Sequence, residues 1–434
     1  MSNCKRSARR IAAALCCVLA AAAVAAPGPA VAQPKGEDFE TAPVLAGNSL
    51  APATLLKGPL HTVAEPVTLA GYFGRFAIES KFGTFNIVGV NMLGVRVDEL
   101  QAIEALQEVQ RSRAFQDSLV RAASAPVQLM QGAVTNPIGT VENVGQGLGS
   151  VLGRARFFAR SGAQSVADST RSASPPVSGL PAAPDGEAMP SAFTNDPFGY
   201  NRARRDWARQ LGIDPYTSNP VLRPLLDNAS AASFAGSFAI STAIGSVSMG
   251  ANLVVTLDTD VREAVWNRPP IDLARENETR LRAMGVSGRT TRDFLRNRWF
   301  TPSLQTALVI NLTKMGKVSG VQSVIHVASQ MEGEANVRFF VESVRMLRDF
   351  QVNEGGLAKL RTSGMVPLGI AEDGQLVAAA AIDYAYWDKT AAEFAHRKEF
   401  KAKRRTVLVA GAASERARQN FEKAGWQLRS GLRG

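Results

Sequence analysis

An uncharged stretch of thirty residues, 228–257, limits what this chain can fold into more than any other segment. It is long enough to cross a bilayer, because a membrane-spanning helix needs roughly 20 apolar residues. It is also rich in serine, alanine, glycine and threonine, and Gly236, Gly245 and Gly250 interrupt it. A lipid-exposed segment has to be one continuous helix. The stretch therefore predicts a buried helix of small residues, with a membrane-inserted segment as the alternative.

The first 32 residues have the parts of a secretory signal peptide. A basic start precedes an apolar segment over residues 11–26, and the pattern Ala30-Val31-Ala32 predicts cleavage after Ala32. An uncleaved anchor is the alternative, but the apolar segment is short and prolines end it. We expect an exported bacterial protein that is periplasmic or associated with the cell envelope.

All three cysteines lie in this leader, so the mature chain has no thiolate nucleophile, cysteine metal site or disulfide. The leader also holds four of the 49 basic residues and none of the 38 acidic ones, which leaves a net charge of +7 on the mature chain. For an exported protein this charge favours an anionic membrane surface or a cell-wall polysaccharide as partner, rather than nucleic acid.

Composition and periodicity divide the mature chain into six segments. They are a flexible lead-in over 33–58, a small α+β unit over 59–125, a glycine-rich amphipathic connector over 126–164, a low-complexity linker over 165–197, a helical domain over 198–355, and a C-terminal α/β part over 356–434. The last two segments can also form one domain. The connector is either a segment that lies on a membrane surface or a link on the protein's own surface.

Two patterns define the small α+β unit. Alternating apolar residues over 67–80 and 84–90, separated by Gly83, predict a β-hairpin. An apolar stripe at helical spacing then predicts an amphipathic helix that packs onto the hairpin, with Glu99 off the stripe. The stripe consists of Val97, Leu100, Ile103, Leu106 and Val109.

The remaining pattern is helical and then changes to strands. Helices are expected at 202–211, from 220 into the uncharged stretch, and at 258–266, 271–284, 290–298, 302–315 and 319–350. The turn Asp373-Gly374 predicts a hairpin, and a strand over 406–410 precedes a helix capped by Ser414 and a return strand. The predicted class is α+β: a small N-terminal antiparallel sheet with a helix, a Pro/Ser-rich linker, and a predominantly helical domain with a C-terminal β-hairpin and a βαβ-like segment.

The densest aromatic segment of the chain is a candidate ligand site. Tyr384, Tyr386 and Trp387 lie between Asp383 and Asp388. On a strand, flat rings beside carboxylates can form a platform for a sugar. The alternative is that they cover the sheet against the helical domain.

Two basic clusters are candidates for contact with an anionic surface, because a basic helix binds anionic lipid. A solvated charged face is the alternative. The first cluster contains Arg289, Arg292, Arg296 and Arg298, and the second contains Lys401, Lys403, Arg404 and Arg405.

No spacing of His, Asp or Glu indicates a metal site or a cofactor, and none is predicted. Asp258 and Asp260 follow the uncharged stretch and are interpreted as the start of a helix, where negative charge is favoured. The leading hypothesis is a non-catalytic binding or scaffolding module at the membrane or cell-wall surface. The alternatives are a periplasmic hydrolase that uses Asp or Glu with Ser or Tyr, and a component inserted in the membrane through residues 228–257.

Overall fold

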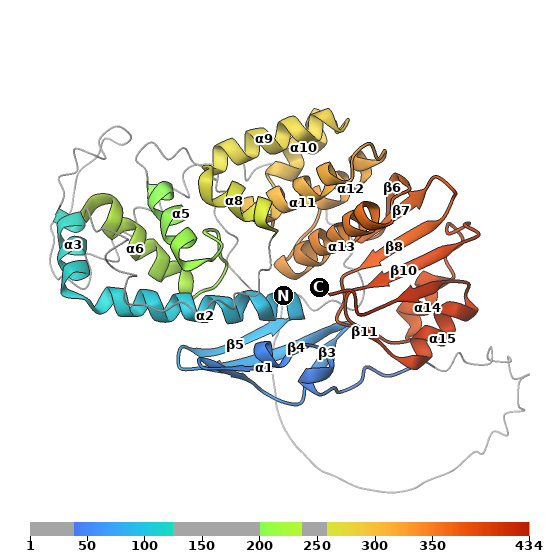
Figure 1. Ribbon diagram of the computed structural model, residues 1–434, viewed down its shortest axis with the longest axis horizontal. Coiled ribbons are helices and arrows are strands. Elements are labelled where there is room, and N and C mark those ends of the chain that lie inside the picture. Colours follow the sequence, from blue (N-terminus) through green and yellow to red (C-terminus); the bar gives the residue numbers. More distant parts are fainter. Residues whose placement is uncertain (1–38, 125–199, 237–257, 434) are drawn as a thin grey trace, which may run out of the picture. The chain divides into compact units, whose positions relative to one another are not determined.

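The N-terminal sheet forms around one long strand (Figure 1). The computed structural model describes residues 39–124, 200–236 and 258–433. Strand β4 (Phe73–Ser80) pairs antiparallel with β5 (Gly83–Val88) at one edge, and with β2 and β3 at the other. The predicted hairpin at Gly83 is thus confirmed. The short elements around it are η1 (Gly47–Ser49), α1 (Ala53–Leu56), β1 (Lys57–Gly58), β2 (His61–Val63) and β3 (Thr68–Ala70).

The described part of the expected lead-in contributes to this unit. Residues 47–58 form η1, α1 and β1, and Leu50, Ala51 and Leu55 are buried in the core beneath the sheet. The free energy gained by burying these apolar side chains offsets the conformational entropy lost when the backbone becomes ordered. Proline and glycine content alone therefore gave too flexible a picture of residues 47–58.

Helix α2 (Val90–Arg111) follows the sheet and buries the predicted stripe residues Leu100, Ile103, Leu106 and Val109. It shares one hydrophobic core with α3 (Arg113–Ser124), α5 (Tyr200–Leu211) and α6 (Leu222–Gly236). The start of the uncharged stretch lies in α6, where Ala229 and Ala232 are fully buried. The rest of that stretch, residues 237–257, and the predicted connector and linker lie outside the described residues.

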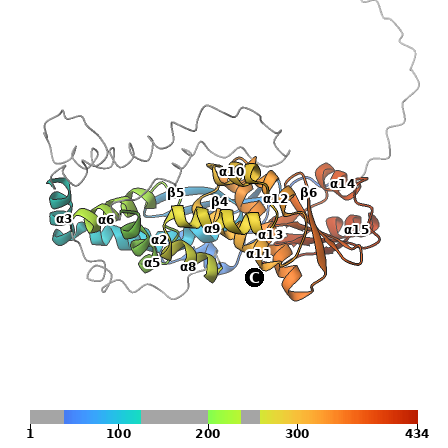
Figure 2. The ribbon, with the colours of Figure 1, turned by 90° about the horizontal axis from the view of Figure 1, so that it is seen from above.

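The next helices form a second core (Figure 2). The predicted helix over 319–350 is in fact two helices: the first ends at Ser329, and Gly333, with φ 84°, directly precedes the second. Among the described residues, no helix is both long and apolar enough to cross a membrane. These helices are α8 (Thr259–Asn267), α9 (Pro270–Ala283), α10 (Gly288–Leu295), α11 (Pro302–Lys314), α12 (Val321–Ser329) and α13 (Glu334–Asn353).

The C-terminal sheet has the strand order β12-β10-β8-β7-β6. β6, β7 and β8 are antiparallel neighbours, and β10 runs parallel to both β8 and β12. This confirms the hairpin at Asp373-Gly374 and the βαβ-like segment, and adds β6 as a strand that was not predicted. The bounds are β6 (Leu357–Ser363), β7 (Val366–Ala371), β8 (Leu376–Ala380), β10 (Arg405–Val409) and β12 (Gln427–Arg429).

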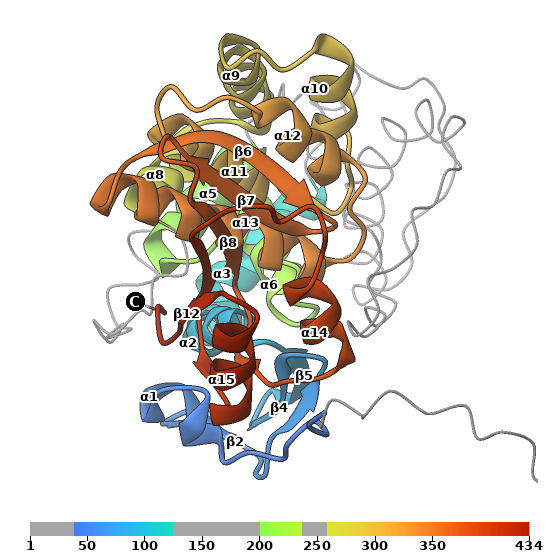
Figure 3. The same cartoon turned by 90° about the vertical axis from the view of Figure 1, so that its right-hand side faces the viewer.

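Apart from Arg405 at the start of β10, the central strands β8 and β10 carry no charge, and both of their faces are buried. Val377 and Leu408 belong to the core shared with α13, whereas Leu376 and Val407 pack on the other face. Parallel strands covered on both sides show this continuous apolar pattern. The second face is covered by α14 (Lys389–Ala395) and α15 (Glu415–Lys423), which appear with the sheet in Figure 3. Class α+β with an N-terminal antiparallel sheet is therefore confirmed.

Candidate binding sites

The aromatic segment lies where the N-terminal sheet meets the C-terminal sheet. Its strand β9 is short (Tyr384–Ala385) and pairs with β11 (Ala412–Ala413). The backbone N–H of Trp387 donates to Glu40 Oε2 at 2.6 Å, and the Glu40 N–H donates to the Trp387 carbonyl at 2.7 Å. Ser414 Oγ donates to the same carboxylate oxygen at 2.7 Å.

Most of the aromatic side chains are buried at this joint. Trp387 packs edge-on against Phe421, with ring centroids 5.4 Å apart, and Tyr386 packs against Tyr72 at 5.2 Å. Tyr384 is the partly exposed ring. Binding of a ligand by this segment stays a prediction, and the geometry gives Trp387 and Tyr386 packing partners within the protein.

Asp388 and Tyr72 form a hydrogen-bonded pair. The Tyr72 hydroxyl donates to Asp388 Oδ1 at 2.5 Å, and the same oxygen caps α14 by accepting from the Ala391 N–H at 2.8 Å. Burial and the Asp388 carboxylate raise the pKa of Tyr72, and burial raises the pKa of Tyr384 and Tyr386. A tyrosine nucleophile or base has to lose its proton readily, so these shifts oppose such a role.

Asp383 is a buried carboxylate that joins four segments of the chain. Its oxygens accept from the N–H groups of Gly74, at 2.9 Å, and of Val90, at 3.1 and 3.2 Å. Val90 is the first residue of α2, so the carboxylate also meets the positive end of that helix dipole. Arg433 completes the set with an ion pair at 2.5 Å. Burial raises the pKa of Asp383, and Arg433 and the two N–H groups oppose the rise.

The first basic cluster is exposed to solvent. Arg289, Arg292, Arg296 and Arg298 are all exposed on α10 and the turn after it. Arg282 of α9 extends the cluster, because its guanidinium and that of Arg292 lie on the same side of Gly288. A Cβ atom at Gly288 would be 3.1 Å from Arg282 Nη2 and 3.5 Å from Arg292 Nη1. We call these five arginines the basic surface. Its acids are Asp293, 4.0 Å from Arg289, and Glu278, 2.9 Å from Arg282.

The second basic cluster is divided by the structure. Lys401, Lys403 and Arg404 are exposed, and Arg404 pairs with Asp373. Arg405 is half-buried at the start of β10, where its guanidinium lies 5.4 Å from the Trp426 ring centroid and donates to the Ala424 carbonyl at 2.6 Å. Arg405 therefore packs on a ring within the protein.

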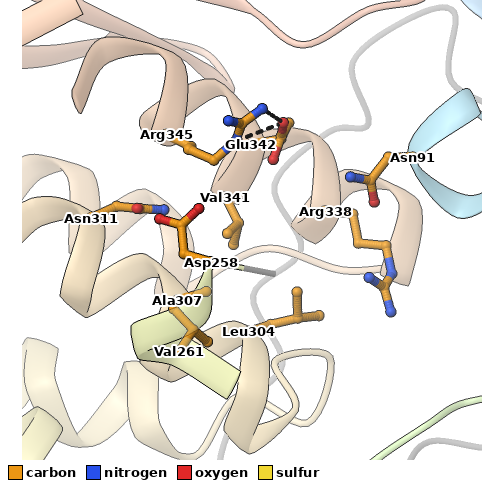
Figure 4. A pocket seen from close by; sticks show the side chains of 10 residues that line it. All are labelled: Asn91, Asp258, Val261, Leu304, Ala307, Asn311, Arg338, Val341, Glu342 and Arg345. Atoms are coloured by element: carbon orange, nitrogen blue, oxygen red, sulfur yellow. Dashed lines mark hydrogen bonds and ion pairs between the residues drawn. The ribbon is translucent and has the colours of Figure 1, made fainter. Parts of the chain in front are cut away.

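A small polar pocket lies among α2, α8, α11 and α13 (Figure 4). Its volume is about 380 Å³, including the part open to solvent. Three charged residues of α13, namely Arg338, Glu342 and Arg345, are spaced by four and three positions and therefore share one face of the helix. The lining residues are Asn91, Asp258, Val261, Leu304, Ala307, Asn311, Arg338, Val341, Glu342 and Arg345.

Each charged side chain of the pocket forms an ion pair with a side chain of opposite charge. Arg338 Nε donates to Glu334 at 2.9 Å, and Arg345 Nε donates to Glu342 at 2.8 Å. Arg348 pairs with Asp258 and donates to Asn311 at 2.7 Å. Burial alone would raise the pKa of Glu334, but the neighbouring Arg338 and Arg96 outweigh it and lower that pKa.

A second buried network adjoins this pocket through Glu334. Glu334 accepts from Ser218 at 2.9 Å, and Ser218 accepts from Arg96 at 2.8 Å. Arg96 and Asn219 both donate to Glu99, at 2.6 and 2.9 Å, and Thr217 donates to its other oxygen. Glu99 is 2 % exposed, so this residue off the apolar stripe is buried as well, within a polar network.

The described residues contain no group of three or more His, Cys, Asp or Glu that could hold a metal ion. Comparison of the chain with models of known families, with curated proteins and with solved structures finds no match. Functional arguments for this chain therefore rest on its own surfaces and pocket.

Asp214 is expected to make stability depend on pH. Burial raises the pKa of this carboxyl above the ordinary 3.8, against hydrogen bonds from Ser303 at 2.6 Å and from the Tyr216 N–H at 2.8 Å. A raised folded-state pKa gives stability that is full below the unfolded pKa and is lost as pH rises through the folded one. Wild type should therefore lose stability relative to Asp214→Asn as pH rises from about 4 to 7 in urea denaturation. The exposed Asp272→Asn is the control, and a difference independent of pH would contradict the expectation.

Proposed function

We propose that this protein is an exported, non-catalytic envelope protein that binds an anionic membrane surface through its basic surface. The observation that carries the proposal is the exposure of four arginines on α10 and the turn after it, with Asp293 as the one acid in that segment. Neighbouring arginine side chains that outnumber the acids beside them repel one another, and an anionic surface relieves this repulsion. Export follows from the leader sequence, and attachment to the membrane from the charge of this surface.

Neighbouring residues support the basic surface as a stable platform. Ser287 caps α10 by accepting from the Thr290 N–H at 3.3 Å, and Phe294 and Leu295 bury the opposite side of the helix. Arg298 lies 5.0 Å from the Trp299 ring centroid, which directs its guanidinium along the surface. Arg289 and Arg292 thus project from a helix whose other side is fixed in the core.

Binding to vesicles tests this proposal. We expect the mature protein to sediment with phosphatidylglycerol vesicles and to dissociate from them as the salt concentration rises. It should not sediment with phosphatidylcholine vesicles. Replacing Arg289, Arg292, Arg296 and Arg298 with glutamine should weaken binding by about 100-fold or more, because each basic residue near an anionic membrane contributes about 1 kcal/mol.

The control for charge removes four exposed basic residues elsewhere: Lys57, Arg111, Lys317 and Lys423. This variant should keep most of the affinity. Equal loss in both variants would show that only net charge matters and would overturn the assignment to the basic surface. Binding to purified peptidoglycan but not to the vesicles would overturn the proposal that the partner is a membrane and would favour the cell wall as the partner.

A further inference from the structure

Strand β5 is an edge strand of the N-terminal sheet (Figure 1). It pairs with β4 on one side, and the Gly89 N–H continues this ladder by donating to the Gly74 carbonyl at 2.9 Å. Hydrogen-bonded pairs alternate along antiparallel strands, so the N–H and C=O groups of Thr84, Asn86 and Val88 point away from β4. Among the described residues, none of these outward groups has a hydrogen-bond partner. The outer side of β5 therefore offers a row of free donors and acceptors to another strand.

The other edge strands of the two five-stranded sheets have features that oppose pairing with a further strand. β6 contains Lys359 and Arg361, and the Leu360 N–H already donates to the Ser319 carbonyl at 2.7 Å. β1, β3 and β12 have only two or three residues each. Charged side chains and short strands are common protections of a sheet edge. β5 has neither, since it consists of six residues, Gly83–Val88, without charge or proline.

The edge of β5 is complementary to a second copy of itself. A two-fold axis at Asn86 places Asn86 opposite Asn86 of the second copy and Thr84 opposite Val88 of that copy, so all the outward N–H and C=O groups find partners. On the core side of the sheet, the same register places Phe85 opposite Ile87 of the second copy. Aromatic and β-branched residues are favourable cross-strand neighbours, and no like charges meet within the paired strands.

We propose that the β5 edges of two copies pair antiparallel and join their N-terminal sheets into one continuous sheet. The dimer is a weak one, because six residues from each copy bury less than the roughly 1,200 Å² at the lower end of stable interfaces. This pairing does not depend on membrane binding by the basic surface.

Charge exchange at Asn86 tests the proposal. The Asn86 side chain is exposed, so Asn86→Lys and Asn86→Asp should keep the fold and the circular dichroism of wild type. In sedimentation equilibrium we expect wild type to dimerise with a dissociation constant of about 100 µM or below. Each variant alone should dimerise about 5-fold more weakly or worse, because like charges then lie opposite each other. An equimolar mixture of the two variants should dimerise more tightly than either alone, since lysine then lies opposite aspartate.

A single cysteine provides a second measurement. All three cysteines lie in the leader, so Asn86→Cys carries the one thiol of the mature chain. It should form a disulfide-linked dimer on oxidation, because a hydrogen-bonded antiparallel pair holds its Cα atoms about 5.5 Å apart, within disulfide range. Thr68, exposed on β3 at the opposite edge of the sheet, gives the controls: Thr68→Lys should dimerise as wild type does, and Thr68→Cys should not cross-link.

Three results would overturn the β5 pairing. One is a wild-type protein that stays monomeric up to about 1 mM. The second is a dimer that neither charge at Asn86 weakens, and the third is equal cross-linking of Asn86→Cys and Thr68→Cys.

Discussion

Replacing Asp383 with alanine is expected to lower the free energy of unfolding by about 3–5 kcal/mol, the usual cost of removing one partner of a buried ion pair. The carboxylate is 1 % exposed and accepts from Arg433 and from the N–H groups of Gly74 and Val90. Without it, these donors lose their acceptor in a site that water reaches poorly. Urea denaturation followed by circular dichroism measures the loss.

The control for this change is Asp373→Ala in the turn between β7 and β8. Asp373 also pairs with an arginine, Arg404, but both side chains are more than half exposed. Exposed pairs contribute at most about 1 kcal/mol. Asp383→Asn should fall between the two, because its amide oxygen still accepts from the backbone. Equal losses for Asp383→Ala and Asp373→Ala would show that Asp383 does not join the segments as described.

Glu99→Ala is expected to have an effect of similar size, about 3–5 kcal/mol. Its carboxylate accepts from Arg96, Thr217 and Asn219 inside the core, and Asn219 accepts in turn from the N–H groups of Val221 and Leu222 at the start of α6. Loss of the acid leaves Arg96 as a buried charge and releases the turn that begins α6. The same denaturation measurement should also show a broader transition if α6 separates first.

Glu104→Ala provides a matched control on the same helix. Glu104 is also ion-paired, with Lys81, but both side chains are over 40 % exposed, so the loss should be below about 1 kcal/mol. The double variant Arg96→Met/Glu99→Leu should be more stable than Glu99→Leu alone, because it removes the orphaned charge. A double variant less stable than the single one would contradict the role assigned to Arg96.

Local patterns were enough to predict the elements that hold the fold together. The hairpin around Gly83, the stripe of α2, the Asp373-Gly374 turn and the Ser414 cap each lie within a short segment whose residues interact with one another. Such signals depend on backbone geometry and on one buried face, both of which are written in adjacent residues.

The structure differs from the sequence predictions where residues far apart in the chain determine the local structure. β6 has charged residues in an alternating segment and becomes a strand by pairing with β7. Asp388 looked like a member of a strand, but it caps α14 and accepts from Tyr72, which lies 316 residues earlier. Glu99 lies off the apolar stripe, and its burial could not be predicted because the residues that surround it, 217–219, are far away in the sequence.

The candidate sites also differ in whether their residues are close together in the sequence or far apart. The basic surface could be predicted because four of its arginines lie within ten residues, and the structure places them in solvent. The polar pocket could not, since its residues come from α2, α8, α11 and α13 and no spacing connects them. Asp258 was noticed only as the start of a helix, and its neighbours Arg348 and Asn311 lie on two later helices.

The bonds of Glu40, Tyr72, Gly74 and Val90 to residues after 380 have a kinetic consequence. During synthesis these early segments wait for roughly three hundred further residues before their partners exist. Contacts between residues far apart in sequence close long loops, and they slow folding. The nascent chain therefore reaches its native state late, which suits a protein that we propose to be exported.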